Sequence, residues 1–84
     1  MTTRSYSFTV LFEPAEEGGY VVTVPALPGC ATQGETLEEA RAIAREAITG
    51  YLEVLQKDGR PIPKDVELRE EPVKEKLTVA LPAA

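Results

Sequence analysis

The chain has 84 residues and a formal net charge of −5, from fourteen acidic and nine basic side chains. This length suits one small domain, which buries roughly 60% of the surface that its unfolded chain exposes. The negative charge disfavours direct binding to nucleic acid, where clustered Lys and Arg supply most of the affinity. Because no run of about 18 apolar residues and no signal-peptide segment occurs, we expect a cytoplasmic protein without a membrane span.

Apolar and polar residues alternate from Tyr6 to Phe12, which is typical of a half-buried strand with its aromatic face turned inward. The next segment, EPAEEGG at 13–19, combines a proline, acids and two glycines and predicts a hairpin loop. A second alternation over Tyr20–Val24 predicts an antiparallel partner strand. Pro25 should end this strand, because proline has no N–H to donate.

The turn signal Pro28-Gly29 is followed by CATQG at 30–34, whose small and β-compatible residues predict a third strand and hence a meander. Thr36 and Glu39 then fit a capping box. In that motif the hydroxyl accepts from the amide three residues on, and the glutamate reaches back to the first amide. A helix should therefore start at this point.

The strongest periodic signal predicts one helix over Leu37–Lys57, about 31 Å long. Gly59 marks its exit, and the acids before and in its first turn suit the positive end of the helix dipole. Gly50 lies mid-helix, where glycine costs about 1 kcal/mol relative to alanine, and suggests the close approach of another backbone. The apolar stripe consists of Leu37, Ala40, Ala44, Ala47, Ile48, Tyr51, Leu52 and Leu55.

After a proline-rich turn at 58–65, the tail carries Val66 and Leu68 and a charged interval around Pro72. A final alternation over 77–81 predicts one more strand. The expected fold class is therefore α+β. It comprises a three-stranded antiparallel meander, one long helix packed on one face and a C-terminal strand, in the order β-β-β-α-β.

No residues are predicted to be catalytic, cofactor-binding or metal-binding. The acids fall in a hairpin loop, at a helix start and in a mixed-charge stretch over 67–75, and each group suits a solvated surface. Cys30 follows a turn, but no histidine exists to activate it, and a lone cysteine is more often a small buried hydrophobe. A single cysteine excludes an internal disulfide, and without a histidine or a second thiol a zinc site cannot be assembled. Glycine loops of nucleotide sites are also absent.

The run GGYVVTVPALPGCATQGETLEEARAIAREAI, residues 18–48, closely resembles the signature of the HicB-like antitoxin family. The motif positions are Gly19-Tyr20, the Val24-to-Cys30 run, Gly34, the Thr36-x-x-Glu39-Ala40 helix start and Glu46-Ala47-Ile48, and the similarity extends over about residues 6–65. The resemblance implies a partial ribonuclease-H-like domain. It also implies binding to a small basic HicA-type RNA-cleaving toxin, often by an oligomeric antitoxin that represses its own operon.

Members of the family usually carry a C-terminal DNA-binding module, and this chain ends at Ala84. We therefore expect a single HicB-like domain over 1–84 without a separate DNA-binding domain. The segment EKLTVALP could imitate the first strand of a ribbon-helix-helix, but a sheet strand is the preferred interpretation. Ribonuclease H activity is not expected, since its two-metal chemistry needs converging acids and the first strand has none.

Three hypotheses about function follow. The first is an acidic antitoxin-like domain, acting without cofactors or enzymatic activity, that neutralises a basic toxin protein by covering its active surface. Opposite net charges would steer the encounter and a buried apolar patch would hold the complex. The second is a solitary oligomeric binding or regulatory protein without a cognate toxin, and an enzyme ranks third. Exposed edge strands make a homo-oligomer, dimer or tetramer, an expected state.

Overall fold

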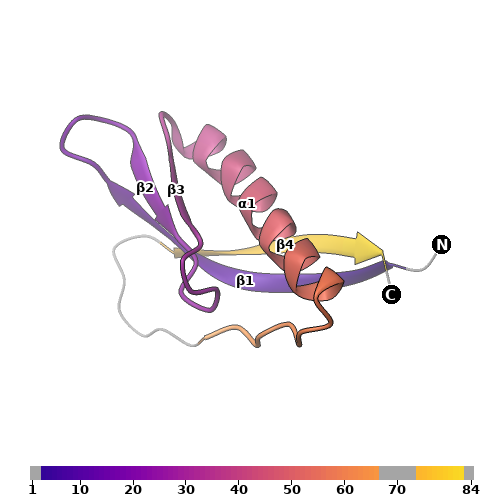
Figure 1. The fold of residues 1–84 in the computed structure, drawn as a ribbon. Coiled ribbons are helices and arrows are strands. Elements are labelled where there is room, and N and C mark those ends of the chain that lie inside the picture. Colours follow the sequence, from indigo (N-terminus) through magenta and orange to yellow (C-terminus); the bar gives the residue numbers. More distant parts are fainter. Residues whose placement is uncertain (1–2, 67–73, 83–84) are drawn as a thin grey trace.

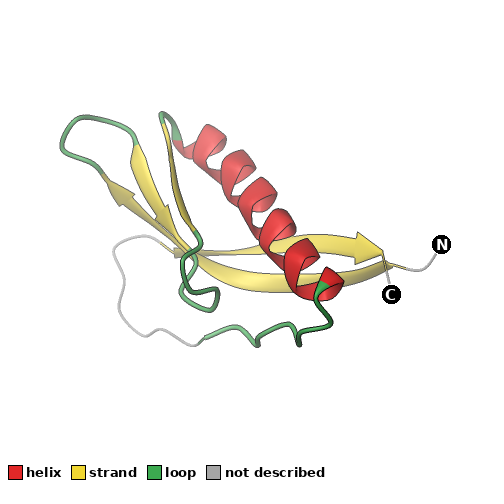
Figure 2. Cartoon of the chain, viewed as in Figure 1, coloured by secondary structure: helices red, strands yellow, loops and turns green. Residues whose placement is uncertain are grey.

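The computed structural model describes residues 3–66 and 74–82, which form a four-stranded antiparallel sheet with one helix on one face (Figures 1 and 2). This arrangement confirms the predicted α+β class and the order β-β-β-α-β. The predictions for Leu68 and Pro72 lie outside the described residues. The elements are β1 (Thr3–Pro14), β2 (Tyr20–Thr23), β3 (Ala31–Gly34), α1 (Leu37–Lys57) and β4 (Lys74–Pro82).

The strand order in the sheet is β3-β2-β1-β4. The C-terminal part of β1 pairs with β2, from Leu11 opposite Thr23 to Pro14 opposite Tyr20. The remainder of β1 pairs with β4, which lies antiparallel to it from Thr3 to Leu11. The last strand is therefore a sheet strand, as expected, and not the start of a ribbon-helix-helix. Its position beside β1 makes β1 a central strand and leaves β3 and β4 at the edges.

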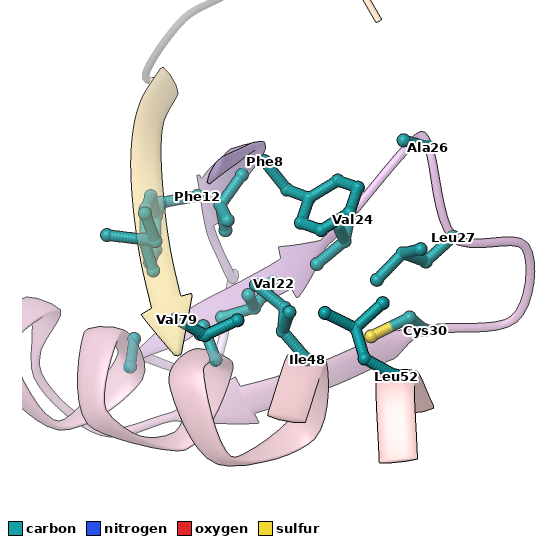
Figure 3. Close-up of a cluster of buried hydrophobic side chains, with 14 of the residues drawn as sticks. Phe8, Phe12, Val22, Val24, Ala26, Leu27, Cys30, Ile48, Leu52 and Val79 are labelled. Carbon is teal, nitrogen blue, oxygen red and sulfur yellow. The ribbon is translucent and has the colours of Figure 1, made fainter. Parts of the chain in front are cut away.

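The core lies between the sheet and the helix (Figure 3). Strand alternation turns Phe8, Val10 and Phe12 inward, as predicted, and each is at most 1% exposed. The helix meets them with five fully or nearly buried residues of the predicted stripe. Because apolar burial is worth about 25 cal/mol per Å², this one layer supplies most of the driving force for folding. The buried helix residues are Ala40, Ala44, Ile48, Leu52 and Leu55.

Both ends of α1 are fixed by specific contacts. The Thr36 hydroxyl accepts a hydrogen bond from the Glu39 N–H at 3.1 Å, which is the first half of the expected capping box. Near the start, the Arg41 Nε donates to both carboxylate oxygens of Glu75 in β4, at 2.7 and 2.8 Å. Near the end, the Gln56 side-chain amide donates to the Pro82 carbonyl at 3.1 Å. The helix is thereby tied along its length to β4.

The expectation for Gly50 was wrong. The residue is exposed, and among the described residues nothing lies within 4 Å of the position that a Cβ would occupy. No backbone of the described part of this chain approaches the helix there. Gly50 therefore lowers the stability of the helix, and no contact among the described residues requires a glycine at this position.

We therefore expect Gly50→Ala to stabilise the domain by about 1 kcal/mol, since alanine loses less backbone entropy in a helix and has room here. Urea denaturation followed by circular dichroism measures the change as a higher midpoint with an unchanged slope. An unchanged or lower midpoint would show that the fold of the isolated chain requires a glycine at position 50. Gly59→Ala offers a contrast, because Gly59 has a φ of +69° and alanine would be strained there.

Candidate functional site

Four glutamates gather at one end of the molecule, and we call them the acidic rim: Glu16, Glu17, Glu35 and Glu39. They line a surface cavity of about 570 Å³ between the β1–β2 hairpin loop and the start of α1. All four side chains are exposed. The other residues that line the cavity are Ala15, Gly18, Tyr20, Gln33 and Gly34.

Strand pairing brings the two halves of the acidic rim together. Tyr20, the first residue of β2, lies opposite Gly34, the last residue of β3. The hairpin loop that precedes Tyr20 and the residues that follow Gly34 must therefore emerge at the same end of the sheet. Gly19 has a φ of +76°, and a Cβ there would lie 2.7 Å from the Gly34 carbonyl oxygen. Only glycine allows the loop to pass so close to β3.

A second glycine contact joins β3 to the helix. A Cβ on Gly34 would lie 2.8 Å from both the N and the Cα of Ala40, in the first turn of α1. The hairpin loop, the end of β3 and the start of the helix are thus stacked backbone against backbone through Gly19 and Gly34. This stacking fixes the separation of the glutamates on the loop from those on the helix.

The electrostatics of the rim favour a cationic partner. No Lys or Arg is among the described residues that line the cavity. The two salt bridges of the described residues lie elsewhere, Arg41–Glu75 at 2.7 Å and Lys76–Asp65 at 3.3 Å. No group of three or more His, Cys, Asp or Glu side chains in residues 3–66 and 74–82 is placed to hold a metal ion. The rim therefore suits Lys and Arg side chains of another protein.

The four acids are exposed, as predicted. The hairpin acids and the helix-start acids were predicted as separate groups, and their convergence on one cavity was not predicted. The signal was present in the predicted meander, because antiparallel pairing of the second and third strands places the loop over 13–19 beside the residues after Gly34.

Cys30, the last residue of the loop between β2 and β3, packs in the core as predicted (Figure 3). The side chain is buried, and its N–H donates to the Leu27 carbonyl at 2.9 Å. Burial raises the pKa of the thiol. The nucleophilic thiolate is thereby disfavoured, which is the opposite of what a reactive cysteine needs.

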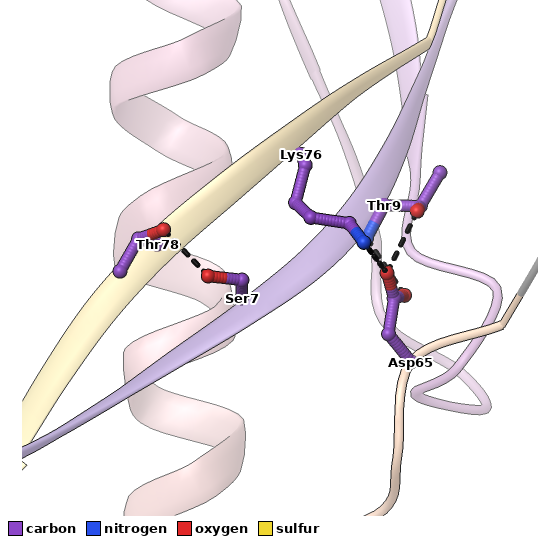
Figure 4. Close-up of polar contacts among 5 residues, drawn as sticks. All are labelled: Ser7, Thr9, Asp65, Lys76 and Thr78. Atoms are coloured by element: carbon purple, nitrogen blue, oxygen red, sulfur yellow. Dashed lines mark hydrogen bonds and ion pairs between the residues drawn. The ribbon is translucent and has the colours of Figure 1, made fainter.

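A polar cluster on the other face of the sheet was not predicted (Figure 4). Asp65 accepts hydrogen bonds from the N–H and the hydroxyl of Thr9, both at 2.8 Å, and pairs with Lys76. Burial alone would raise the pKa of Asp65, but the hydrogen bonds from Thr9, the Val66 N–H and Lys76 outweigh it, so the pKa is lowered. Thr9 lies two residues before Leu11, the first residue of β1 that pairs with β2. Asp65 therefore accepts the Thr9 N–H on the side where β2 offers no partner.

A smaller cavity of about 300 Å³ lies at the opposite end of β1 and α1. Arg4 and Arg60 contribute to its lining, together with Tyr6 and Gln56. The two cavities give the molecule an acidic end and a basic end.

The only helix of the described residues, α1, does not have the length and apolar character of a membrane span.

Comparison with known proteins gives a consistent family assignment. Residues 8–80 match the sequence profile described as HicB_like antitoxin of bacterial toxin-antitoxin system. A UPF0150 protein, Ta0767, of Thermoplasma acidophilum is 52% identical over 58 residues, which cover 69% of this chain and 84% of the relative. Antitoxin HicB 1 of Photorhabdus laumondii is 40% identical over 60 residues, and antitoxin HicB of Escherichia coli K12 is 38% identical over 56.

The similarity to the two named antitoxins covers 71% and 67% of this chain but only 39% and 41% of those proteins. The crystal structure of the N-terminal domain of Burkholderia pseudomallei antitoxin HicB superposes with a TM-score of 0.63 at 25% sequence identity. That match covers 93% of this chain and 98% of the solved domain. The described fold is therefore similar to that of the N-terminal domain of the Burkholderia antitoxin.

Proposed function

Because the chain belongs to the HicB-like antitoxin family, we propose that it is a protein-binding domain that neutralises a toxin in the cytoplasm. The partner is a small basic HicA-type RNA-cleaving protein, and the domain acts by covering the partner's active surface. The match of residues 8–80 to the antitoxin profile carries this proposal. We further propose that the domain over 1–84 has no catalytic activity, does not bind DNA by itself, and forms homo-oligomers.

The acidic rim supports the choice of a basic partner. Its four glutamates lie on a chain whose net charge is −5. Complementary charge raises the rate of encounter more than the final affinity, and it weakens as salt is added. The rim is thus suited to steer a basic protein towards this end of the molecule.

A second function is a solitary binding or regulatory protein without a cognate toxin. The lengths of the relatives support this second function, because the matched region spans 84% of the UPF0150 protein Ta0767 and less than half of the named antitoxins. A thermal-shift screen for ligands addresses this alternative, since a compound that binds only the folded state raises the melting temperature.

The antitoxin proposal is tested by co-expressing this chain with the product of the neighbouring gene and capturing the complex by affinity at moderate salt. We expect capture of a small basic protein and suppression of its RNA cleavage. The variant Glu16→Lys/Glu17→Lys should slow association by about tenfold at low salt. Failure of the wild type to bind or inhibit a basic neighbour would contradict the proposal.

The matched control is Glu13→Lys/Asp58→Lys, which raises the net charge of the chain by the same amount at two exposed positions that do not line the cavity of the acidic rim. It should alter association less than the hairpin variant. Equal slowing by both variants would show that the local position of the rim is irrelevant to steering.

A further inference from the structure

One flank of α1 carries apolar residues along the border of the core, and we call it the helix seam: Ile43, Ala47, Gly50 and Val54. Of these, Ala47 also packs against the core. Their spacing of four, three and four residues aligns them in one row along the helix. Ile43 and Ala47 are partly buried and Gly50 is exposed. Val54 is 58% exposed, more than the other exposed large hydrophobic of the described residues, Val21.

Charged and aromatic side chains border the helix seam. On its outer side Glu39, Glu46 and Glu53 follow one another at intervals of seven residues, and all three are exposed. On its inner side the Tyr51 hydroxyl donates a hydrogen bond to the Pro28 carbonyl at 3.0 Å, which holds the Tyr51 side chain against the loop after β2. Glu39 also belongs to the acidic rim, so the row of acids continues from the rim along the helix.

The isolated domain does not account for the composition of the seam. Gly50 weakens the helix, and within the described residues no atom uses the space beside it. Val54 leaves apolar surface in water at a position where helices commonly carry a charged residue. Small residues between two larger apolar ones let a second helix approach closely, and the seam therefore has the form of a helix-packing surface.

We propose that the helix seam is the docking site for a basic amphipathic helix of the toxin partner. This inference rests on the proposed function and specifies its apolar contact. Ile43 and Val54 would pack against apolar residues of the incoming helix, Gly50 would admit its backbone, and Lys or Arg beside that apolar stripe would meet Glu46 and Glu53. The acidic rim steers the partner, and the seam holds it.

Charge determines which occupant fits. A second copy of this chain would bring the same row of glutamates against the seam, and antiparallel pairing of the two seams would place Glu46 of one copy near Glu53 of the other. Like charges opposed in this way are unfavourable. A helix with basic flanks instead gains opposite-charge pairs at these positions, so the observed charges favour a basic partner over self-association.

The variant Gly50→Gln tests the seam, because it fills the approach space with a long side chain that favours helix formation. We expect the dissociation constant for the captured basic partner to rise about tenfold or more, while the domain itself is not destabilised. Ala42→Gln is the matched control. Ala42 is exposed on the same helix but lies outside the seam, and its variant should bind as the wild type does.

A partner-independent measurement uses a synthetic helix of leucine and lysine with one apolar stripe. In methyl NMR spectra of the full chain, we expect this peptide to shift Ile43, Ala47 and Val54 and to leave Val21, on the other face of the sheet, unmoved. The same peptide with glutamate in place of lysine should bind much more weakly. Equal binding of both peptides, or shifts centred away from the seam, would refute the inference.

The outcomes also separate the two proposals. If wild type captures a basic partner and Gly50→Gln binds it equally well, the seam assignment is wrong and the antitoxin function stands. If wild type captures no partner, both fail. If the chain self-associates and Gly50→Gln abolishes that association, a second copy occupies the seam and the basic-helix assignment is overturned.

Discussion

Gly34→Ala should destabilise the domain by about 2–3 kcal/mol, the range expected when a methyl group is forced into a packed site. Its Cβ would lie 2.8 Å from two backbone atoms of Ala40. Backbone cannot rotate away as a side chain can, so the helix start or β3 must shift. Moving the helix start also disturbs the hydrogen bond between the Ala40 N–H and the Thr36 carbonyl, 2.8 Å long.

Thermal denaturation measures this effect, which corresponds to a fall of roughly 10–20 °C in melting temperature for a domain of this size. Gly50→Ala is the control, because it adds the same methyl group at a glycine with open space around it. The two variants should move the melting temperature in opposite directions. Equal shifts would mean that the contact between β3 and α1 does not constrain the fold.

Asp65→Ala is expected to destabilise the domain by about 2–3 kcal/mol, because it removes two hydrogen bonds to a carboxylate and leaves the Thr9 N–H without its acceptor. Thr9 is 6% exposed, and water compensates poorly for a loss at such a site. Urea denaturation at neutral pH measures the difference. A matched control is Asp58→Ala, which removes an exposed aspartate at the helix C-cap. Equal losses of stability in the two variants would show that the hydrogen bonds of Asp65 to Thr9 contribute no more than an exposed aspartate does.

The contribution of Asp65 should depend on pH in a defined direction. Its pKa is lowered in the folded state, so the unfolded chain binds a proton at a higher pH than the native one does. Its stabilisation is therefore complete above the ordinary aspartate value of about 3.9 and is lost as the pH falls through the lowered native pKa. The difference between wild type and Asp65→Asn should shrink over that acidic interval and stay constant at higher pH. A difference that persists unchanged in acid would contradict this assignment.

Local patterns in the sequence predicted the elements well. Alternation predicted three of the four strands, and a Pro-Gly turn followed by small, β-compatible residues predicted the third strand along the chain. The three-four spacing with Thr36 at its start predicted the bounds of the helix, which the structure reproduces from Leu37 to Lys57. These patterns work because one face of each element packs on a common core, and burial imposes the period on the sequence.

The features that were missed depend on contacts between distant residues. The position of β4 beside β1 leaves no trace in the alternation of either strand. Asp65 serves Thr9 from 56 positions away, and nothing near Asp65 in the sequence indicates this partner. Gly50 was misread because a glycine inside a helix does not by itself show that another backbone lies beside it, and within the described residues none does.

The pairing of β1 with β4 has a consequence for how the domain folds. The hairpin and the helix join neighbouring segments, but the side chains of Ser7 and Thr78, 71 positions apart, meet across the β1–β4 pair. Contacts between such distant positions slow folding relative to helical domains of similar length, because the loop must close before the pairing stabilises it. During synthesis residues 3–10 of β1 therefore have no strand partner until β4 has been made. An unpaired strand of this kind is open to association with other chains.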